Sequence, residues 1–592
     1  MTDKEVKLAI QSAIKSFATG NLTDQAISLF KTLGYNTERQ NPFTHKTFAF
    51  FKESFLDGDS RFNEEKAFAK EWKSVDLLFQ LTKDEVSDQK SLFGTGKVKW
   101  DGEDKETVIE TYLFFALELT KAEYTRTALA QITREINKVF PMPVMIVFKY
   151  GKNLTFSVIN RRLHKKDERK DVLEKVTLIK DISTINPHRA HIEILFDLSF
   201  EELKQEHKVT NFVELHNAWQ KTLDTKELNK KFLQEVSNWY FWAMEYVSFP
   251  ADVEKNTSIR NATSLIRLIT RIIFIWFIRE KNLVPQKIFD RAEISKILKG
   301  FYQDKKSHNY YLAILQNLFF GTLNQKMGAR KFAQDGGLQD NKIEYGVKTL
   351  FRYLNLFAIA EKEALNLFED VPFLNGGLFD CLDKENDAGQ VFYVDGFSRN
   401  PQKQAIVPDF LFFGEEEAYD LNDIYDTRNK SYKVKGLFNI LSGYKFTITE
   451  NTPVEEEIAL DPELLGKVFE NLLASYNPET QTTARKQTGS FYTPREIVSY
   501  MVDESLKVYL KQKMEAEAGM DAQDADVALG FLFEYNEKEH LFDEKQTDVL
   551  IKTIDNCKIL DPACGSAAFP MGTLHTLAHI LHKLDPNNEK WK

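Results

Sequence analysis

The feature that most restricts the fold lies near the end of the 592-residue chain. Residues 557–560 are apolar enough for a short buried strand, and residues 561–568 form a turn of small side chains. A helix is expected next, with these apolar residues facing inward: Phe569, Leu574, Leu577, Ile580, Leu581 and Leu584. A strand that turns directly into a helix opens a doubly wound α/β sheet. One strand and one helix cannot bury their own apolar faces, so further strands must complete such a domain.

The turn at 561–568 also indicates a ligand. Its small residues, Gly565 among them, allow a ligand to approach the backbone. The free N–H groups at the start of the helix favour a polar or anionic group. The sequence therefore predicts that a cofactor binds there.

Two further helix starts lie upstream of this turn. Asp461 and Pro462 are typical of an N-cap and a first helical position, and apolar residues follow at helical spacing: Leu464, Leu465, Val468, Phe469, Leu472 and Leu473. Thr493 and Glu496 have the spacing of a capping box, with Pro494 at the first helical position. The acidic stretch 515–525 is expected to be a loop or an insertion.

Residues 112–162 contain both strand and helix signals. Segments 112–119, 142–151 and 153–162 are rich in β-branched and aromatic residues. Between the first two, apolar residues recur at helical spacing: Leu129, Ile132, Ile136, Val139 and Phe140. This order predicts a strand, helix, strand, strand unit within an N-terminal α/β module.

The pair of segments TGSFYTP (488–494) and DPACGSA (561–567) resembles the cofactor motifs of gamma-arranged N6-adenine DNA methyltransferases. Four further segments resemble large bacterial type IIG restriction-modification proteins: RIIFIWFIREKNLVP (271–285), VPFLNGGLFD (371–380), LDPELLGKVFENLL (460–473) and HKLDPNNEKWK (582–592). The resemblance covers most of the chain from about residue 260 onward. It implies a Rossmann-like domain that uses S-adenosylmethionine and acts on double-stranded DNA.

Carried over by position, the resemblance implies cofactor-binding residues in both motifs. Beside the methionine moiety it places Phe491, Tyr492, Thr493 and Pro494, and in the cofactor turn Asp561, Ala563 and Gly565. The chain departs from the family at Ala567, where the family has a second glycine. A methyl group there weakens binding if the turn needs a positive φ or a close approach.

The part that holds a flipped adenine in this family is missing from the sequence. The four Asn-Pro pairs, at 41, 186, 400 and 477, lack the aromatic residue of an NPPY motif. The methyltransferase catalytic residues are therefore unknown, and this chain alone is expected to be inactive. We expect it to be the N-terminal portion of a longer enzyme, or one half of a split enzyme.

Type IIG proteins usually carry an N-terminal nuclease of the PD-(D/E)xK kind, which needs clustered carboxylates for Mg²⁺ and a nearby lysine. The candidate carboxylates are Asp76 and Glu118, and Mg²⁺ is expected only if this module is an active nuclease. Lys121 lies one place beyond the expected position, and one residue along a strand turns a side chain to the opposite face. The alternative is that Glu118 ends a strand in a degenerate or unrelated α/β domain.

Composition restricts the environment of the chain. Three cysteines in 592 residues are too few for a disulfide framework, and no signal peptide is recognisable at the N-terminus, so a cytoplasmic protein is expected. The apolar run at 271–278 is too short to span a bilayer. A formal net charge of −10 argues against DNA binding over the whole surface. No metal site is expected, because His188 and His191 lack neighbouring ligands and are more typical of a polar face.

Together these patterns predict a multidomain chain of α/β and α regions. Residues 1–215 form the N-terminal α/β module, 216–455 a mainly helical connector, and 456–592 the start of the methyltransferase domain. The predicted function is site-specific DNA adenine-N6 methylation in a restriction-modification system. The alternatives are a non-catalytic DNA-binding or scaffold subunit with a vestigial cofactor turn, and a nuclease with a cofactor-sensing methyltransferase remnant.

Overall fold

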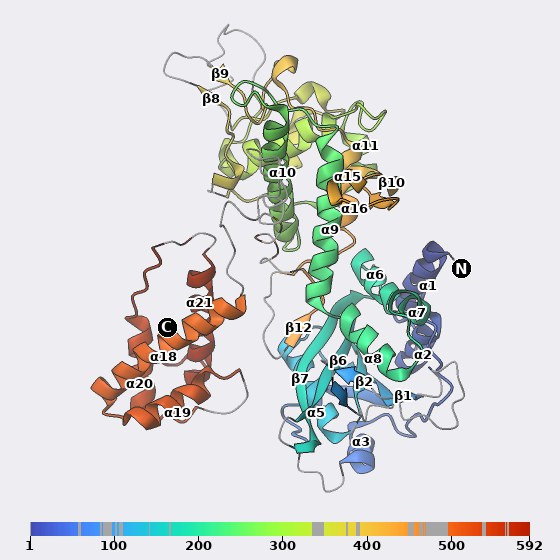
Figure 1. Cartoon of the computed structure of the whole chain (residues 1–592), viewed down its shortest axis with the longest axis vertical. Coiled ribbons are helices and arrows are strands. Elements are labelled where there is room, and N and C mark those ends of the chain that lie inside the picture. The colour runs from blue at the N-terminus through green and yellow to red at the C-terminus, as the bar shows by residue number, and fades with distance from the viewer. Residues whose placement is uncertain are drawn as a thin grey trace. The chain divides into compact units, whose positions relative to one another are not determined.

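The computed structural model divides the chain into two compact units, Met1–Thr482 and Thr483–Lys592. The residues it describes are 2–56, 61–82, 86, 98–100, 103–105, 111–140, 142–164, 167–333, 349–374, 377–385, 391–447, 455–460, 464, 466, 468, 495–535, 540–562, 564 and 567–591. Both units are shown in Figure 1.

A six-stranded mixed sheet with the order β1-β4-β5-β6-β7-β12 organises the N-terminal part of the first unit. Its strands are β1 Trp72–Thr82, β4 Thr111–Leu119, β5 Val144–Tyr150, β6 Asn153–His164, β7 Asp167–Ser183 and β12 Glu455–Glu457. The pairs β4–β5 and β7–β12 are parallel and the other pairs are antiparallel. The strand, helix, strand, strand unit predicted for 112–162 is confirmed, with α5 (Arg126–Val139) between β4 and β5.

Helices cover both faces of this sheet because its side chains alternate between two apolar cores. On β4, Phe114 and Ala116 pack with α1 (Asp3–Ser16) and α2 (Leu22–Thr32), and also with α6–α8. Phe115 and Leu117 point to the other face. The bounds of the remaining helices at the sheet are α3 Phe48–Phe55, α6 Arg189–Asp197, α7 Phe200–His207 and α8 Phe212–Thr222.

The rest of the first unit is mainly helical, and α9 (Thr225–Met244) runs into it from the sheet (Figure 1). Its other helices are α10 Thr257–Arg279, α11 Arg291–Ile297, the π-helix Tyr311–Leu323, α13 Glu361–Asn366, α14 Phe410–Phe413, α15 Asn422–Tyr425 and α16 Leu437–Leu441. Short strands pair as β8 Lys384–Glu385 with β9 Val391–Phe392, and β10 Glu417–Tyr419 with β11 Tyr432–Val434. A separate pair is β2 Val98–Trp100 with β3 Glu103–Lys105. The 3-10 turns are Ala69–Glu71, Gln286–Phe289, Met327–Ala329, Leu354–Leu356, Gly377–Phe379 and Pro401–Lys403.

Helix α10 contains the apolar run at 271–278. By length and composition this helix could cross a membrane, yet 72% of its most apolar 18-residue stretch is buried inside the protein. Arg271, within this run, forms an ion pair of 3.1 Å with Asp395 and donates hydrogen bonds to the carbonyls of Leu378 and Asp380. The helix thus serves as a core element that holds residues 378–380 in place.

The second unit is a group of helices: α18 Arg495–Lys513 with a π-helical continuation Met514–Ala518, α19 Ala522–Phe533, α20 Glu544–Asp555 and α21 Ala568–Leu584. The prediction of a loop at 515–525 is wrong for most of the segment: residues 515–518 lie in the π-helix and 522–525 begin α19, and only 519–521 lie outside a helix. Asp521 accepts a hydrogen bond from the Gln523 N–H as the N-cap of α19, and Ala525 lies in the core. The acidic residues of this segment are exposed, whereas Met514 and Ala525 face the core of the unit.

Candidate functional site

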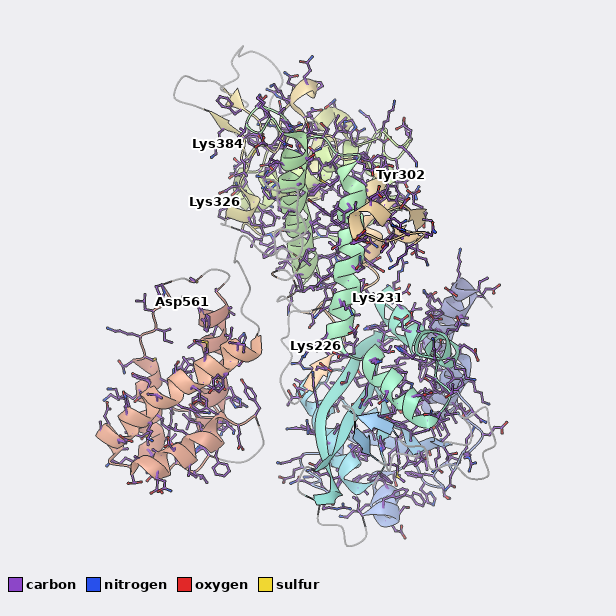
Figure 2. All side chains as sticks on the ribbon, viewed as in Figure 1. Lys226, Lys231, Tyr302, Lys326, Lys384 and Asp561 are labelled. Atoms are coloured by element: carbon purple, nitrogen blue, oxygen red, sulfur yellow. The ribbon has the colours of Figure 1, made fainter. Side chains whose placement is uncertain are left out.

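The predicted cofactor turn connects residue 560 to α21. Asp561 is half-buried, Cys564 is exposed, and the Ala567 N–H donates to the Cys564 carbonyl over 2.7 Å. Ala563 and Gly565, also predicted to shape this turn, lie outside the described residues. Among the described residues of the turn, Asp561 is the acidic side chain at its start (Figure 2).

Ala567 has the conformation that a glycine favours. Its φ is 64° and its ψ is 26°, and it occupies the N-cap position of α21 without a side-chain cap. L-residues with a Cβ pay about 1–2 kcal/mol for this left-handed conformation. An N-cap usually supplies a side-chain oxygen to the first N–H groups of the helix, which alanine cannot do.

The segment before the turn differs from the prediction. Residues 557–560 form no strand, and Leu560 and Ile559 are 87% and 53% exposed. Leu574, predicted to face inward, is 57% exposed, whereas Ile580 and Leu584 are buried as predicted. The reason is physical: a strand needs neighbouring strands to pair with, and the described residues of this unit contain helices but no strand.

Helices α18 and α21 follow the two predicted motifs and pack against each other. A Cβ built on Gly572 would lie 2.7 Å from Val498 Cγ1, and Thr576 Oγ1 donates to Asp503 Oδ1 over 3.1 Å. Val498 lies beside Gly572, and Asp503, further along α18, lies beside Thr576, further along α21. The two helices are therefore parallel and begin at the same end. Phe491, Tyr492, Thr493 and Pro494 lie outside the described residues.

The nuclease candidates lie on one face of the sheet, on neighbouring antiparallel strands. Asp76 of β1 is opposite Ala116, and Glu118 of β4 is opposite Ser74, so the two carboxylates are diagonal neighbours. Such positions are about 7–8 Å apart. In the parallel pair β4–β5, Lys149 lies beside Glu118. The sheet thus places two carboxylates and a lysine on the same face.

Each carboxylate already has protein partners. Asp76 is buried; its Oδ1 accepts from the Phe43 N–H over 2.8 Å, and its Oδ2 accepts from Thr23 over 2.7 Å and pairs with Lys46 over 2.8 Å. Glu118 Oε1 pairs with Lys73 over 2.9 Å. A Mg²⁺ ion at Asp76 would therefore share this carboxylate with three protein donors.

The lysine and histidine residues considered for the nuclease and for a metal site have other partners. Lys121 pairs with Glu71 over 2.6 Å rather than with Glu118. His191 was expected on a polar face, but it is buried, with 2% of its surface exposed. His188 Nδ1 accepts from the Ala190 N–H as the N-cap of α6. Within the described ranges, no three His, Cys, Asp or Glu side chains gather as metal ligands.

Taken together, the fold is that of a mixed α/β multidomain protein. No family model and no solved structure matches the chain. The chain is 24% identical over 408 residues to a protein of Methanocaldococcus jannaschii named "Putative type II restriction enzyme and methyltransferase". The match covers 67% of this chain and 28% of that relative, so the chain spans well under half of the relative's length.

Proposed function

We propose that the chain is the N-terminal portion of a cytoplasmic, site-specific DNA adenine-N6 methyltransferase of a restriction-modification system. The name of the M. jannaschii relative supports the restriction-modification class and a DNA methyltransferase. The observation that carries the proposal is that α18 and α21 run parallel to each other. The two helices that follow the motifs therefore begin at the same end of the helical unit. The catalytic motif and the remaining strands would come from a C-terminal continuation or from a split partner subunit.

In this proposal the residues of both motifs hold S-adenosylmethionine. The left-handed backbone at Ala567 and the uncapped start of α21 fit a turn that opens toward a ligand. Asp561, Ala563 and Gly565 would shape the pocket, and Phe491, Tyr492, Thr493 and Pro494 would contact the methionine part. The bound cofactor supplies the methyl group from its sulfonium. The helix N-terminus would orient the carboxylate of the methionine moiety.

The test is calorimetric titration of S-adenosylmethionine into the chain as it stands and into its Ala567→Gly variant. Binding that Ala567→Gly strengthens supports the proposal, because glycine adopts this backbone without strain. Binding that does not respond to Ala567→Gly or to Asp561→Ala contradicts a cofactor site at this turn. If neither protein binds, titration of the full-length or two-subunit enzyme decides, and no binding there overturns the proposal.

A second candidate function is Mg²⁺-dependent DNA cleavage by the N-terminal module. The order β1, β4, α5, β5 and the shared face of Asp76 and Glu118 favour it. In the full-length protein, Glu118→Ala should abolish cleavage and spare methylation, whereas Glu71→Ala, on the neighbouring Lys121 pair, should spare both. Unchanged cleavage by Glu118→Ala would exclude this role.

A further inference from the structure

A cavity of about 280 Å³ lies on the sheet face that carries α8 and α9, at the opposite end of β4 from Glu118. It is lined by β4, β6, β7 and β12, by α8, and by the residues that lead from α8 into α9. Its apolar walls are Tyr112, Val158, Trp219 and Leu223. Its volume falls just below the usual range for drug-sized ligands, so it fits a smaller molecule.

The charges that line this cavity balance. Lys175 and Lys226 oppose Asp224 and Glu456. The Glu456 carboxylate accepts from Thr177 over 3.0 Å, and it also pairs with Lys175. With no net positive charge, the cavity does not favour a phosphate-bearing ligand. An uncharged polar molecule complements it.

A hydrogen-bond relay orients one amide at the cavity. The Gln220 Nε2 donates to His216 Nε2 over 3.0 Å, and His216 Nδ1 contacts the Tyr112 hydroxyl. Burial lowers the pKa of His216 to about 4, so the imidazole is neutral near pH 7. Because its Nε2 accepts, its Nδ1 carries the proton and donates to Tyr112.

Gln220 keeps capacity for a ligand after this bond. Its amide retains a second N–H and its carbonyl oxygen, neither of which has a partner in the part of the chain that the structure describes. A glutamine amide with a free donor and a free acceptor matches the edge of adenine, which offers an amino donor beside a ring-nitrogen acceptor. The rings of Tyr112 and Trp219, which also line the cavity, offer aromatic surface to a planar heterocycle.

We infer that this cavity binds an adenine base, either as a free nucleoside or as a base presented by a single strand, and that Gln220 reads its amino edge. This site lies in the first unit and goes beyond the proposed methyltransferase function. It is separate from the turn at Ala567.

The experiment is calorimetric titration of the whole chain with adenosine, purine riboside and cytidine. Purine riboside lacks the amino group and should bind about ten-fold more weakly than adenosine, as for the loss of one bidentate amide contact. In Gln220→Leu the two ligands should bind equally. Gln234→Leu, an exposed glutamine on α9 that bonds to Asn238 outside the cavity, is the matched control and should keep the ratio.

Three results would overturn the inference: no adenosine binding by the folded chain, equal affinity for adenosine and purine riboside, or a ratio that survives Gln220→Leu. Competition with a thymidine oligonucleotide that carries one central adenine assigns the source. Displacement of adenosine indicates a base presented by a strand, and its absence indicates a free nucleoside. Because S-adenosylmethionine contains adenine, its binding here would depend on Gln220, whereas binding at the turn would depend on position 567.

Discussion

At the residue scale, the methyl group of Ala567 makes the left-handed backbone conformation at this position unfavourable. Glycine adopts this φ of 64° without strain, so we expect Ala567→Gly to stabilise the second unit by about 1 kcal/mol in the free energy of unfolding. Urea unfolding measures this change. Ala578→Gly, at an exposed position inside α21, should instead destabilise by about 1 kcal/mol. Changes of the same sign in both variants would refute the conformational explanation.

Breaking the buried Arg271–Asp395 ion pair should lower the stability of the first unit by more than the change at Ala567 alters that of the second. Both side chains are about 4% exposed, so Arg271→Met leaves a buried carboxylate without its cation. The expected loss is about 3–5 kcal/mol in the free energy of unfolding. The exposed pair Arg291–Glu415 is the control, and Arg291→Met should change stability by less than about 1 kcal/mol. Similar losses in the two variants would show that burial does not decide the effect.

Buried histidines predict a pH dependence. Burial lowers the pKa of His216 and His188 to about 4, whereas an unfolded histidine titrates near 6.5. The unfolded chain therefore takes up more protons, and the stability present above pH 6.5 is lost progressively as pH falls toward 4. Each histidine contributes at most about 1.4 kcal/mol per pH unit. Urea unfolding at pH 7, 6 and 5 measures the slope, which His216→Gln should reduce; an unchanged slope would contradict this origin.

At the element scale, β12 is a strand of three consecutive glutamates that is nevertheless buried. Glu455 pairs with Arg126 over 3.2 Å and accepts from Thr127, at the start of α5. Glu456 accepts from Thr225, at the start of α9. Two helix N-termini thus stabilise carboxylates on this edge strand.

This arrangement predicts that Glu456→Ala releases β12 from the sheet. The amide protons of the β7 residues that pair with it, from Val176 to Leu178, should then exchange faster with deuterium. Glu417→Ala, an exposed glutamate on β10, should leave that exchange unchanged. Protection of Val176–Leu178 that is the same in all three proteins would show that Glu456 does not hold the strand.

The sequence predicted correctly those helices and strands whose formation depends on the spacing of nearby apolar residues. The unit from 112 to 162 was predictable because strand and helix periodicities are clear there. The burial of β12 was not, since three glutamates indicate a solvent-exposed segment and their partners lie hundreds of residues away. The strand predicted at 557–560 does not form for the converse reason: Cys557, Ile559 and Leu560 are apolar, but the described residues of the second unit supply no neighbouring strand. Gln220 and His216 were missed because a polar helix end gives no signal of a cavity.

At the scale of the whole molecule, the two units differ in how well they bury apolar surface. In the second unit Leu560, Tyr500 and Val508 are 87%, 67% and 57% exposed. We expect calorimetry to show two melting transitions, with the second unit unfolding at the lower temperature. Ala567→Gly should move only the lower transition and Arg271→Met only the upper one. A single transition that both variants move would mean that the units unfold together.

The order in which the sheet is assembled has a consequence during synthesis. Strand β7 ends at Ser183 and its parallel neighbour β12 begins at Glu455, about 270 residues later. A ribosome adds roughly 5–20 residues per second, so β7 waits on the order of 15–55 s for its neighbour. During that interval its unpaired N–H and C=O groups offer a template to other nascent chains. The slow arrival of one short strand therefore sets the period in which the protein most needs a chaperone.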